Sequence, residues 1–375
     1  MNAERLHLIA KTIKVELDGT RSTDLMQELI TALDKVIKQQ NEPNEQELSQ
    51  KLDQIHTALR GVNSDTFSPA WRQILDEIGG AYLLGRELKD KLEEVFSRHQ
   101  ITQAGALEEL QPIAEDLKSF KTAIDKLVNA FGAIGIGEEK LEPGECEFGY
   151  MIPRDYINNN LVEFSEELKE VNFILKTISE VASGEIQEVE IRTISSSDLL
   201  IYLKIIPAAA TFIAIAAERI IQAYKNLLDI KIRRIELKEL GLPDESLGGV
   251  DSYANEFMED AIKRIAEEIF EQYNKVEDPS RKNELLVAII IVLNKIANRI
   301  DQGFNIEVRA EPLPPPEEDE EEGSIEPADA AMREQIDRII EAQSTLEFTH
   351  AEGPPILSLP ESNDVSDSGK DKTKN

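Results

Sequence analysis

The sequence contains few cysteine, histidine and aromatic residues. Among its 375 residues is one cysteine, Cys146, which excludes an internal disulfide framework and a cysteine-based metal cluster. Aromatic residues make up 5% of the chain, so the cores should consist mainly of Leu, Ile, Val and Ala, as in packed helices. We expect no metal, because the four histidines show no ligand spacing: His7, His56, His99 and His350. No cofactor is expected either.

Basic residues are outnumbered by acidic ones. The chain has 41 Lys and Arg residues against 73 Asp and Glu residues, a formal net charge of −32. Binding to nucleic acid is not expected, because a phosphate-binding face needs clustered Lys and Arg. Residues 311–375 alone contain 18 acidic and 5 basic residues, which is typical of a disordered acidic tail. The expected partner is instead a protein, or a second copy of this chain.

Long uncharged apolar runs are absent. The first residues carry charges throughout, so no signal peptide is expected and a cytoplasmic location is the default interpretation. The nearest approach to a membrane span is residues 199–217, which contain one charge, Lys204, and Pro207 near the middle. A lysine at the centre of a span costs ~3 kcal/mol. A strand followed by a buried helix is therefore favoured, and membrane insertion of 199–217 stays an alternative.

Hydrophobic periodicity predicts an α+β protein that is predominantly α-helical. We expect a helical bundle at 1–131, a glycine-containing linker at 132–144, an α+β domain with long helices at 145–310, and the tail at 311–375. The glycines of the linker follow a helix rather than a strand, so they do not match a dinucleotide-binding loop. The second domain should contain a small β-α-β-β-α unit, with its sheet covered by helices on one face.

The expected elements follow from apolar spacing, capping residues and breaks. Helices are predicted at 3–17, from Ser22 or Thr23 to 37, at 45–59, from 69 to 98 with a kink or break at its glycines, and at 107–131. In the second domain we expect strands at 148–152, 186–194 and 199–206, a fourth strand at 304–308, and helices at 160–182, 208–240, 252–276 and from 279 to 299 or 301. The last of these contains the apolar run Leu285 to Leu293. A marginal helix at 328–342 is predicted to dock or to fold on a partner.

One candidate binding loop joins the two central strands. It consists of Arg192, Ser195, Ser196, Ser197 and Asp198. Small polar residues are typical of a hairpin turn, because Ser and Asp hydrogen-bond to their own backbone. No G-x-S-x-G sequence surrounds the serines, so a catalytic serine is not indicated. Recognition of a ligand by this loop remains a hypothesis, since loops on a rigid sheet often bind partners.

A second candidate is a basic face in the latter half of the long helix 208–240. It contains Lys231, Arg233, Arg234 and Lys238. Such residues usually form a solvated face interleaved with glutamates. A more specific hypothesis is that they receive the acidic tail in an intramolecular clamp that salt would weaken.

These patterns favour a non-enzymatic protein-interaction or regulatory component of a cytoplasmic complex, because no catalytic constellation is apparent. Two alternatives remain: a membrane-associating protein that inserts residues 199–217, and an enzyme without a linear motif that uses a site near Ser195 to Asp198.

Overall fold

A computed structural model of the chain describes residues 3–99, 102–195, 199–241, 248–314, 327–345 and 353–362. These residues are mainly helical and include a small four-stranded antiparallel sheet, which confirms the predicted fold class. The chain divides into two compact units, Met1–Lys140 and Leu141–Asn375. Each unit has a hydrophobic core of its own, so each is described by itself.

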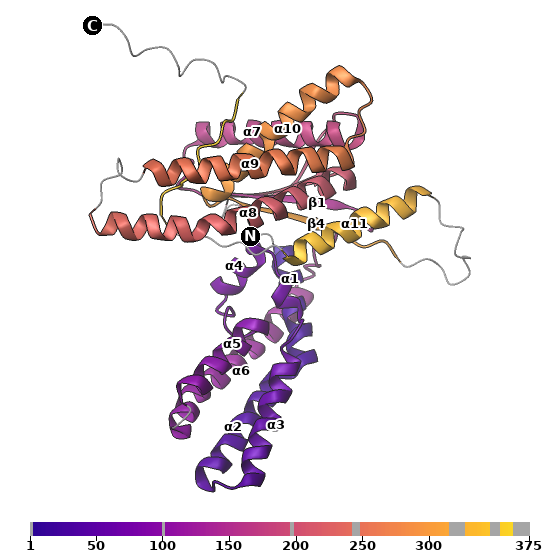
Figure 1. The fold of residues 1–375 in the computed structure, drawn as a ribbon. Helices are drawn as coiled ribbons and strands as arrows, with labels where there is room; N and C mark the ends of the chain where they lie inside the picture. The colour runs from indigo at the N-terminus through magenta and orange to yellow at the C-terminus, as the bar shows by residue number, and fades with distance from the viewer. Residues whose placement is uncertain are drawn as a thin grey trace. The chain divides into compact units, whose positions relative to one another are not determined.

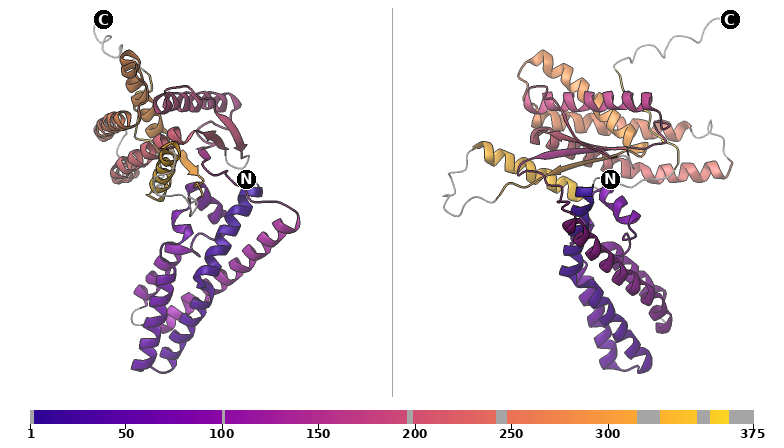
Figure 2. Two further views of the ribbon diagram at one scale, coloured as in Figure 1. Left: turned by 90° about the vertical axis from the view of Figure 1, so that its right-hand side faces the viewer. Right: turned by 180° about the vertical axis from the view of Figure 1, so that it is seen from behind.

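The first unit is a bundle of helices (Figure 2). Its elements are α1 (Ala3–Thr20), α2 (Ser22–Lys38), α3 (Glu42–Ala58), the 3₁₀ helix η1 (Asn63–Thr66), α4 (Pro69–Glu77), α5 (Gly85–Arg98) and α6 (Gln103–Ala133). Helix α4 begins as predicted, with the Ser68 side chain accepting a hydrogen bond from its first turn. Helix α3 begins three residues before the predicted start at 45, because the Asn41 side chain caps it and the proline stands in its first turn. Their apolar stripes, mostly Leu and Ile, meet in one core.

The second unit combines the sheet with long helices (Figure 1). Its elements are β1 (Cys146–Ile152), α7 (Leu161–Ser183), β2 (Glu190–Ile194), β3 (Leu199–Ile205), α8 (Pro207–Glu239), α9 (Gly248–Tyr273), α10 (Pro279–Asp301), β4 (Asn305–Ala310) and α11 (Pro327–Thr345). The strand order is β2-β3-β1-β4. Tyr150 of β1 pairs with Ile201 of β3 and with Ile306 of β4, and all three side chains enter the core.

Residues 199–217 form β3 and the buried start of α8. Phe212, Ile213 and Ala214 are at most 1% exposed and belong to the core of the second unit. Their burial explains the apolar composition of this stretch without a lipid environment. Among the described residues, no helix has the length and apolarity required to cross a membrane.

Two stretches of the acidic tail pack against the second unit. Helix α11 contacts α8 and β4 and buries Ile336 and Ile339. The helix predicted at 328–342 is therefore present, and it docks on the second unit. Residues 353–362 are extended (yellow in Figure 1) and bury apolar side chains. For this second stretch the structure differs from the predicted disordered tail, because its aliphatic residues supply buried area. The acidic block 317–322 and residues 363–375 lie outside the described residues.

Candidate functional site

The main candidate site is the surface of α9 and α10 that holds residues 353–362, called the 353–362 segment below. Prolines restrict this segment to extended conformations at Pro354, Pro355 and Pro360. Docking such a chain therefore costs less conformational entropy than docking a flexible one. The polar residues that contact it form the docking surface: Asn255 on α9, and Asn294, Lys295, Asn298, Arg299 and Asp301 on α10.

Two asparagine side chains bind the backbone of the segment in a bidentate way. Asn298 donates from Nδ2 to the carbonyl oxygen of Leu359 (3.1 Å) and accepts from the N–H of the same residue (3.0 Å). Asn255 accepts from the N–H of Ser358 (2.7 Å) and donates to the carbonyl oxygen of Ile356 (3.3 Å). A carboxamide thus replaces the neighbouring strand that would pair with an extended chain in a sheet.

Asp301 at the end of α10 binds two successive N–H groups of the segment. Its Oδ2 accepts from the backbone N–H of Ile356 (2.6 Å) and Leu357 (2.7 Å). Its Oδ1 accepts from Lys231 Nζ (3.0 Å) and from the hydroxyl of Tyr224 (2.6 Å), both on α8. Burial, followed by the charge and hydrogen bond of Asp301, raises the pKa of Tyr224. The buried carboxylate is therefore paired with a cation and fully hydrogen-bonded, as a buried charge must be.

Near the C-terminal end of the docked segment, the side chain of Glu361 binds the buried Arg299. Glu361 accepts from Asn298 Nδ2 (2.7 Å) and from Arg299. Burial raises the pKa of Glu361, but the Asn298 hydrogen bond and the charge of Arg299 outweigh it, so the pKa lies below its ordinary value. Arg299 also forms a bidentate pair with Glu167 of α7 (3.2 and 3.1 Å), which accepts from the Tyr150 hydroxyl (2.6 Å). The charges at this end of the surface are thus linked in one network.

Apolar side chains complete the contact. Ile356, Leu357 and Leu359 are each at most 5% exposed and belong to the core of the second unit. At the start of the segment, Gly353 lies against Ile235 of α8 with φ of +113°. A Cβ atom there would push the end of the isoleucine side chain aside, and the positive φ itself favours glycine.

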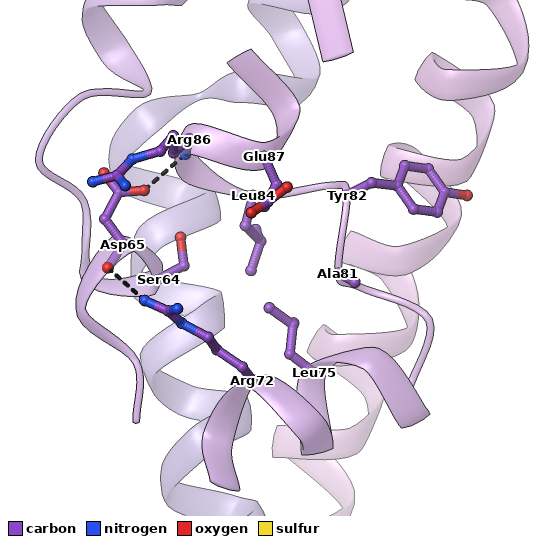
Figure 3. Close-up of a pocket in the computed structure, with 9 residues that line it drawn as sticks. All are labelled: Ser64, Asp65, Arg72, Leu75, Ala81, Tyr82, Leu84, Arg86 and Glu87. Carbon is purple, nitrogen blue, oxygen red and sulfur yellow. Dashed lines mark hydrogen bonds between the residues drawn. The ribbon is translucent and has the colours of Figure 1, made fainter. Parts of the chain in front are cut away.

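A second candidate is a cavity of about 220 Å³ in the first unit, next to η1 and α5. Figure 3 shows Arg72 and Arg86 approaching Asp65, while Tyr82 points away from the other lining residues. Asp65 accepts from the Arg86 backbone N–H at Oδ1 (2.7 Å), and its carbonyl oxygen accepts from Arg72 Nη2 (3.2 Å). Two basic residues face two acidic ones, Asp65 and Glu87, so the cavity favours neither an anion nor a cation.

The serine beside this cavity has a structural role. Ser64 donates from both its hydroxyl and its backbone N–H to Glu16 of α1 (2.7 Å each). Burial raises the pKa of Glu16, opposed by these two hydrogen bonds. Because the carboxylate accepts both donors of the same residue, it fixes η1 against α1 rather than activating a nucleophile.

The candidate loop between β2 and β3 is only partly described. Ser196, Ser197 and Asp198 lie outside the described residues. The backbone N–H of Ser195 donates to the carbonyl oxygen of Leu200 (2.8 Å), closing the hairpin. Arg192 donates to Glu145 (3.1 Å), on the sequence just before β1. Within the described part, Arg192 and Ser195 therefore serve the sheet and do not converge on a ligand site.

The candidate basic face does not form a single exposed surface. Lys231 is 1% exposed and is bound to Asp301, since position 231 lies on the side of α8 that faces α10. Arg234 pairs with Asp251 (2.7 Å), whereas Arg233 and Lys238 are exposed. The tail does contact α8. However, Glu361, the acidic residue of the 353–362 segment, binds Asn298 and Arg299 of α10, so this contact differs from the predicted clamp.

Sequence reasoning missed the docking surface. It identified the apolar run of α10 but not the polar residues that follow, among them Asn294 and Asn298. Their spacing of four residues places both carboxamides on one helix face, and this was the available signal. A second signal was the sequence Ile-Leu-Ser-Leu between prolines in an otherwise polar tail.

The fold and the site together define a mainly helical α+β protein that holds an extended peptide by its backbone. Comparisons of the chain with protein-family models, curated proteins and solved structures found no match. Within the described ranges, no group of three His, Cys, Asp or Glu residues could hold a metal ion. The single cysteine, Cys146, is buried, and burial raises its pKa to about 12, so its thiol is a poor nucleophile.

Proposed function

We propose that this chain is a non-enzymatic protein-interaction component of a cytoplasmic complex, and that its docking surface binds an extended peptide. The 353–362 segment is the resident occupant of that surface. The observation that carries the proposal is the pair of bidentate asparagine contacts, from Asn255 and Asn298, to the segment backbone. Contacts of this kind recognise any extended chain, while adjacent side-chain contacts select its sequence.

The polarity of the docking surface supports exchange of its occupant. A purely apolar docking surface would expose a large hydrophobic area to water when the segment leaves. Here the departing segment exposes the apolar contacts of Ile356, Leu357 and Leu359. It also uncovers carboxamides, Arg299, Lys295 and Asp301, which water can solvate. The surface is therefore suited to exist both with its own segment and with a peptide from a partner.

The two alternatives are less well supported. Membrane insertion of residues 199–217 would require β3 and the start of α8 to leave the core, where Phe212 is fully buried. An enzyme site near Ser195 to Asp198 depends on residues outside the described ranges. Of its described members, Arg192 is paired with Glu145.

The test is peptide binding to a full-length chain whose own segment has been displaced. Ile356→Asp with Leu359→Asp places two charges in buried positions and should release the segment, because an unpaired buried charge is unfavourable. A fluorescein-labelled peptide with the sequence of residues 353–362 is then titrated, and its anisotropy is recorded. We expect binding roughly tenfold or more tighter than to the unmodified chain, whose tethered segment competes at high effective concentration.

A matched control adds the same charges at exposed positions. Ser358→Asp with Ser362→Asp changes two exposed residues of the same segment and should leave peptide binding as weak as in the unmodified chain. Circular dichroism establishes that each variant is folded. A folded chain that carries Ile356→Asp and Leu359→Asp but does not bind the peptide would refute the proposal.

A further inference from the structure

Asn294 is the one asparagine of the docking surface whose hydrogen bonding is incomplete among the described residues. It is 5% exposed, and its Nδ2 donates to the carbonyl oxygen of Pro360 (2.8 Å). Its Oδ1 is buried without a hydrogen-bond partner in the described part of the chain. A buried acceptor left unpaired destabilises the docked state by the loss of its hydration.

The neighbouring asparagine shows what is missing. Asn298, one helical turn further along α10, binds both the carbonyl oxygen and the N–H of Leu359. Asn294 contacts the next residue of the segment, and this residue is proline, which has a carbonyl oxygen but no N–H. Pro360 therefore has no N–H to offer to Asn294.

We infer that the docking surface is complementary to a peptide from another protein that has a backbone N–H where the resident segment has Pro360. This inference rests on the proposed function and specifies the partner of the same site. The resident segment is then an incomplete substitute, which holds the surface until a peptide with the full set of hydrogen bonds displaces it. A second copy of this chain fits less well, because it brings the same proline.

The other contacts define the rest of the partner peptide. Positions 356, 357 and 359 are buried and need aliphatic side chains, whereas position 358 is exposed and accepts any residue. Position 361 needs a carboxylate, because Arg299 and Lys295 both contact Glu361 there. The expected sequence is aliphatic, aliphatic, any residue, aliphatic, any residue except proline, acidic.

The experiment compares two labelled peptides on the full-length chain that carries Ile356→Asp and Leu359→Asp. One has the sequence of residues 353–362, and the other carries Pro360→Ala. We expect the alanine peptide to bind about fivefold to tenfold more tightly, the effect of one buried hydrogen bond. The same two titrations are repeated on a chain that also carries Asn294→Ala. Without the Asn294 acceptor, the alanine peptide should no longer bind more tightly than the proline peptide, and any remaining difference measures the cost of the flexibility that alanine adds.

The outcomes separate the two proposals. If the proline peptide binds but the alanine peptide binds no better, the docking function stands and the inference about Pro360 is overturned. An advantage that persists with Asn294→Ala overturns it as well, because the gain then has another origin. If neither peptide binds the folded chain, the proposed function itself fails.

A measurement on the otherwise unmodified chain gives an independent check. Hydrogen exchange of the Leu359 amide reports opening of the segment, because Asn298 accepts from this N–H. Pro360→Ala should slow this exchange by about fivefold, and Pro360→Ala with Asn294→Ala should not. Exchange that is unchanged or faster in the Pro360→Ala chain, with the alanine peptide also gaining nothing in trans, contradicts the inference.

Discussion

At the scale of single residues, Asp301 connects the core of the second unit to its tail. The carboxylate is buried between Lys231, Tyr224 and two backbone N–H groups of the 353–362 segment. Removing its charge leaves the ammonium group of Lys231, itself 1% exposed, without a counter-ion. A buried ion pair adds little net stability, but breaking one leaves an uncompensated charge.

We therefore expect Asp301→Asn to lower the free energy of unfolding of the second unit by about 3–5 kcal/mol. Urea denaturation followed by far-UV circular dichroism measures this loss. The combined change Asp301→Asn with Lys231→Met should recover part of it, because the ammonium group that lost its counter-ion is then removed as well. Glu268→Gln is the control, since Glu268 pairs with Arg219 at the surface and should change stability by less than about 1 kcal/mol. If Asp301→Asn and Glu268→Gln lowered the free energy of unfolding equally, this account would be contradicted.

The residues of the candidate site were only partly predictable from the sequence. Lys231 was identified as part of a basic face, yet its burial depends on Asp301, which lies seventy positions away in the sequence and meets it only in the fold. Periodicity shows which side of a helix is apolar, but a charged residue is buried only when a partner from another element satisfies it. The same limit applies to Asn298 and Glu361, which are polar in isolation and become a site by pairing.

At the scale of helices and strands, the sequence was more informative. Helices α7 and α8 and strands β1, β3 and β4 lie within two residues of their predicted bounds, because their caps and apolar spacing agree. Asn160 caps α7, and Gly184 ends it with φ of +82°. The predicted Ser22 or Thr23 cap of α2 is wrong: α1 continues to Thr20, so Arg21 alone connects the two helices, with a left-handed backbone.

Gly85 at the start of α5 is an element boundary where a side chain would be strained. Its φ is +44°, and a Cβ atom would overlap Asp65 and Ser64 of η1. We expect Gly85→Ala to lower the free energy of unfolding of the first unit by about 2–4 kcal/mol, from backbone strain together with overpacking. Gly132→Ala in α6 is the matched control, because a Cβ atom there meets nothing within 4 Å. It should be neutral or stabilising by up to about 1 kcal/mol. Chemical denaturation measures both, and equal effects would exclude the steric explanation.

The docking of the 353–362 segment should depend on pH through Glu361. Its pKa lies below the ordinary value of 4.5, so its ionised form favours the docked state. This contribution is fully present above about pH 4.5 and is lost as the pH falls through the lowered pKa. A dye attached at Ser358→Cys, an exposed position, should report release of the segment by a fall in anisotropy on acidification. Cys146 should not be labelled, because burial raises its pKa to about 12.

The control for this prediction is the same labelled chain with Glu361→Gln. Glutamine cannot ionise, so the acid-dependent step should disappear and the segment should already be less firmly docked at neutral pH. If both labelled chains show the same acid transition, another group governs the release.

At the scale of the whole molecule, the residues that the structure describes form two separate hydrophobic cores. The core of the first unit draws only on residues between Ile9 and Ile124, and that of the second on residues between Cys146 and Leu359. The second core includes side chains from the acidic tail, so the tail contributes to folding as well as to charge. Within the described residues, the tail is therefore part of the second unit, an arrangement that its composition alone did not indicate.

Two cores predict two unfolding transitions, and the chain carries a probe for one of them. Its single tryptophan, Trp71, lies in α4 and packs on the core of the first unit. Tryptophan fluorescence should therefore follow the first unit, while far-UV circular dichroism follows both. Gly85→Ala should move the midpoint of the fluorescence transition, which reports the first unit, to a lower urea concentration. Asp301→Asn should leave that midpoint unchanged and should move only the part of the dichroism transition that comes from the second unit. Coincident transitions that both substitutions shift together would mean that the two cores unfold as one cooperative structure.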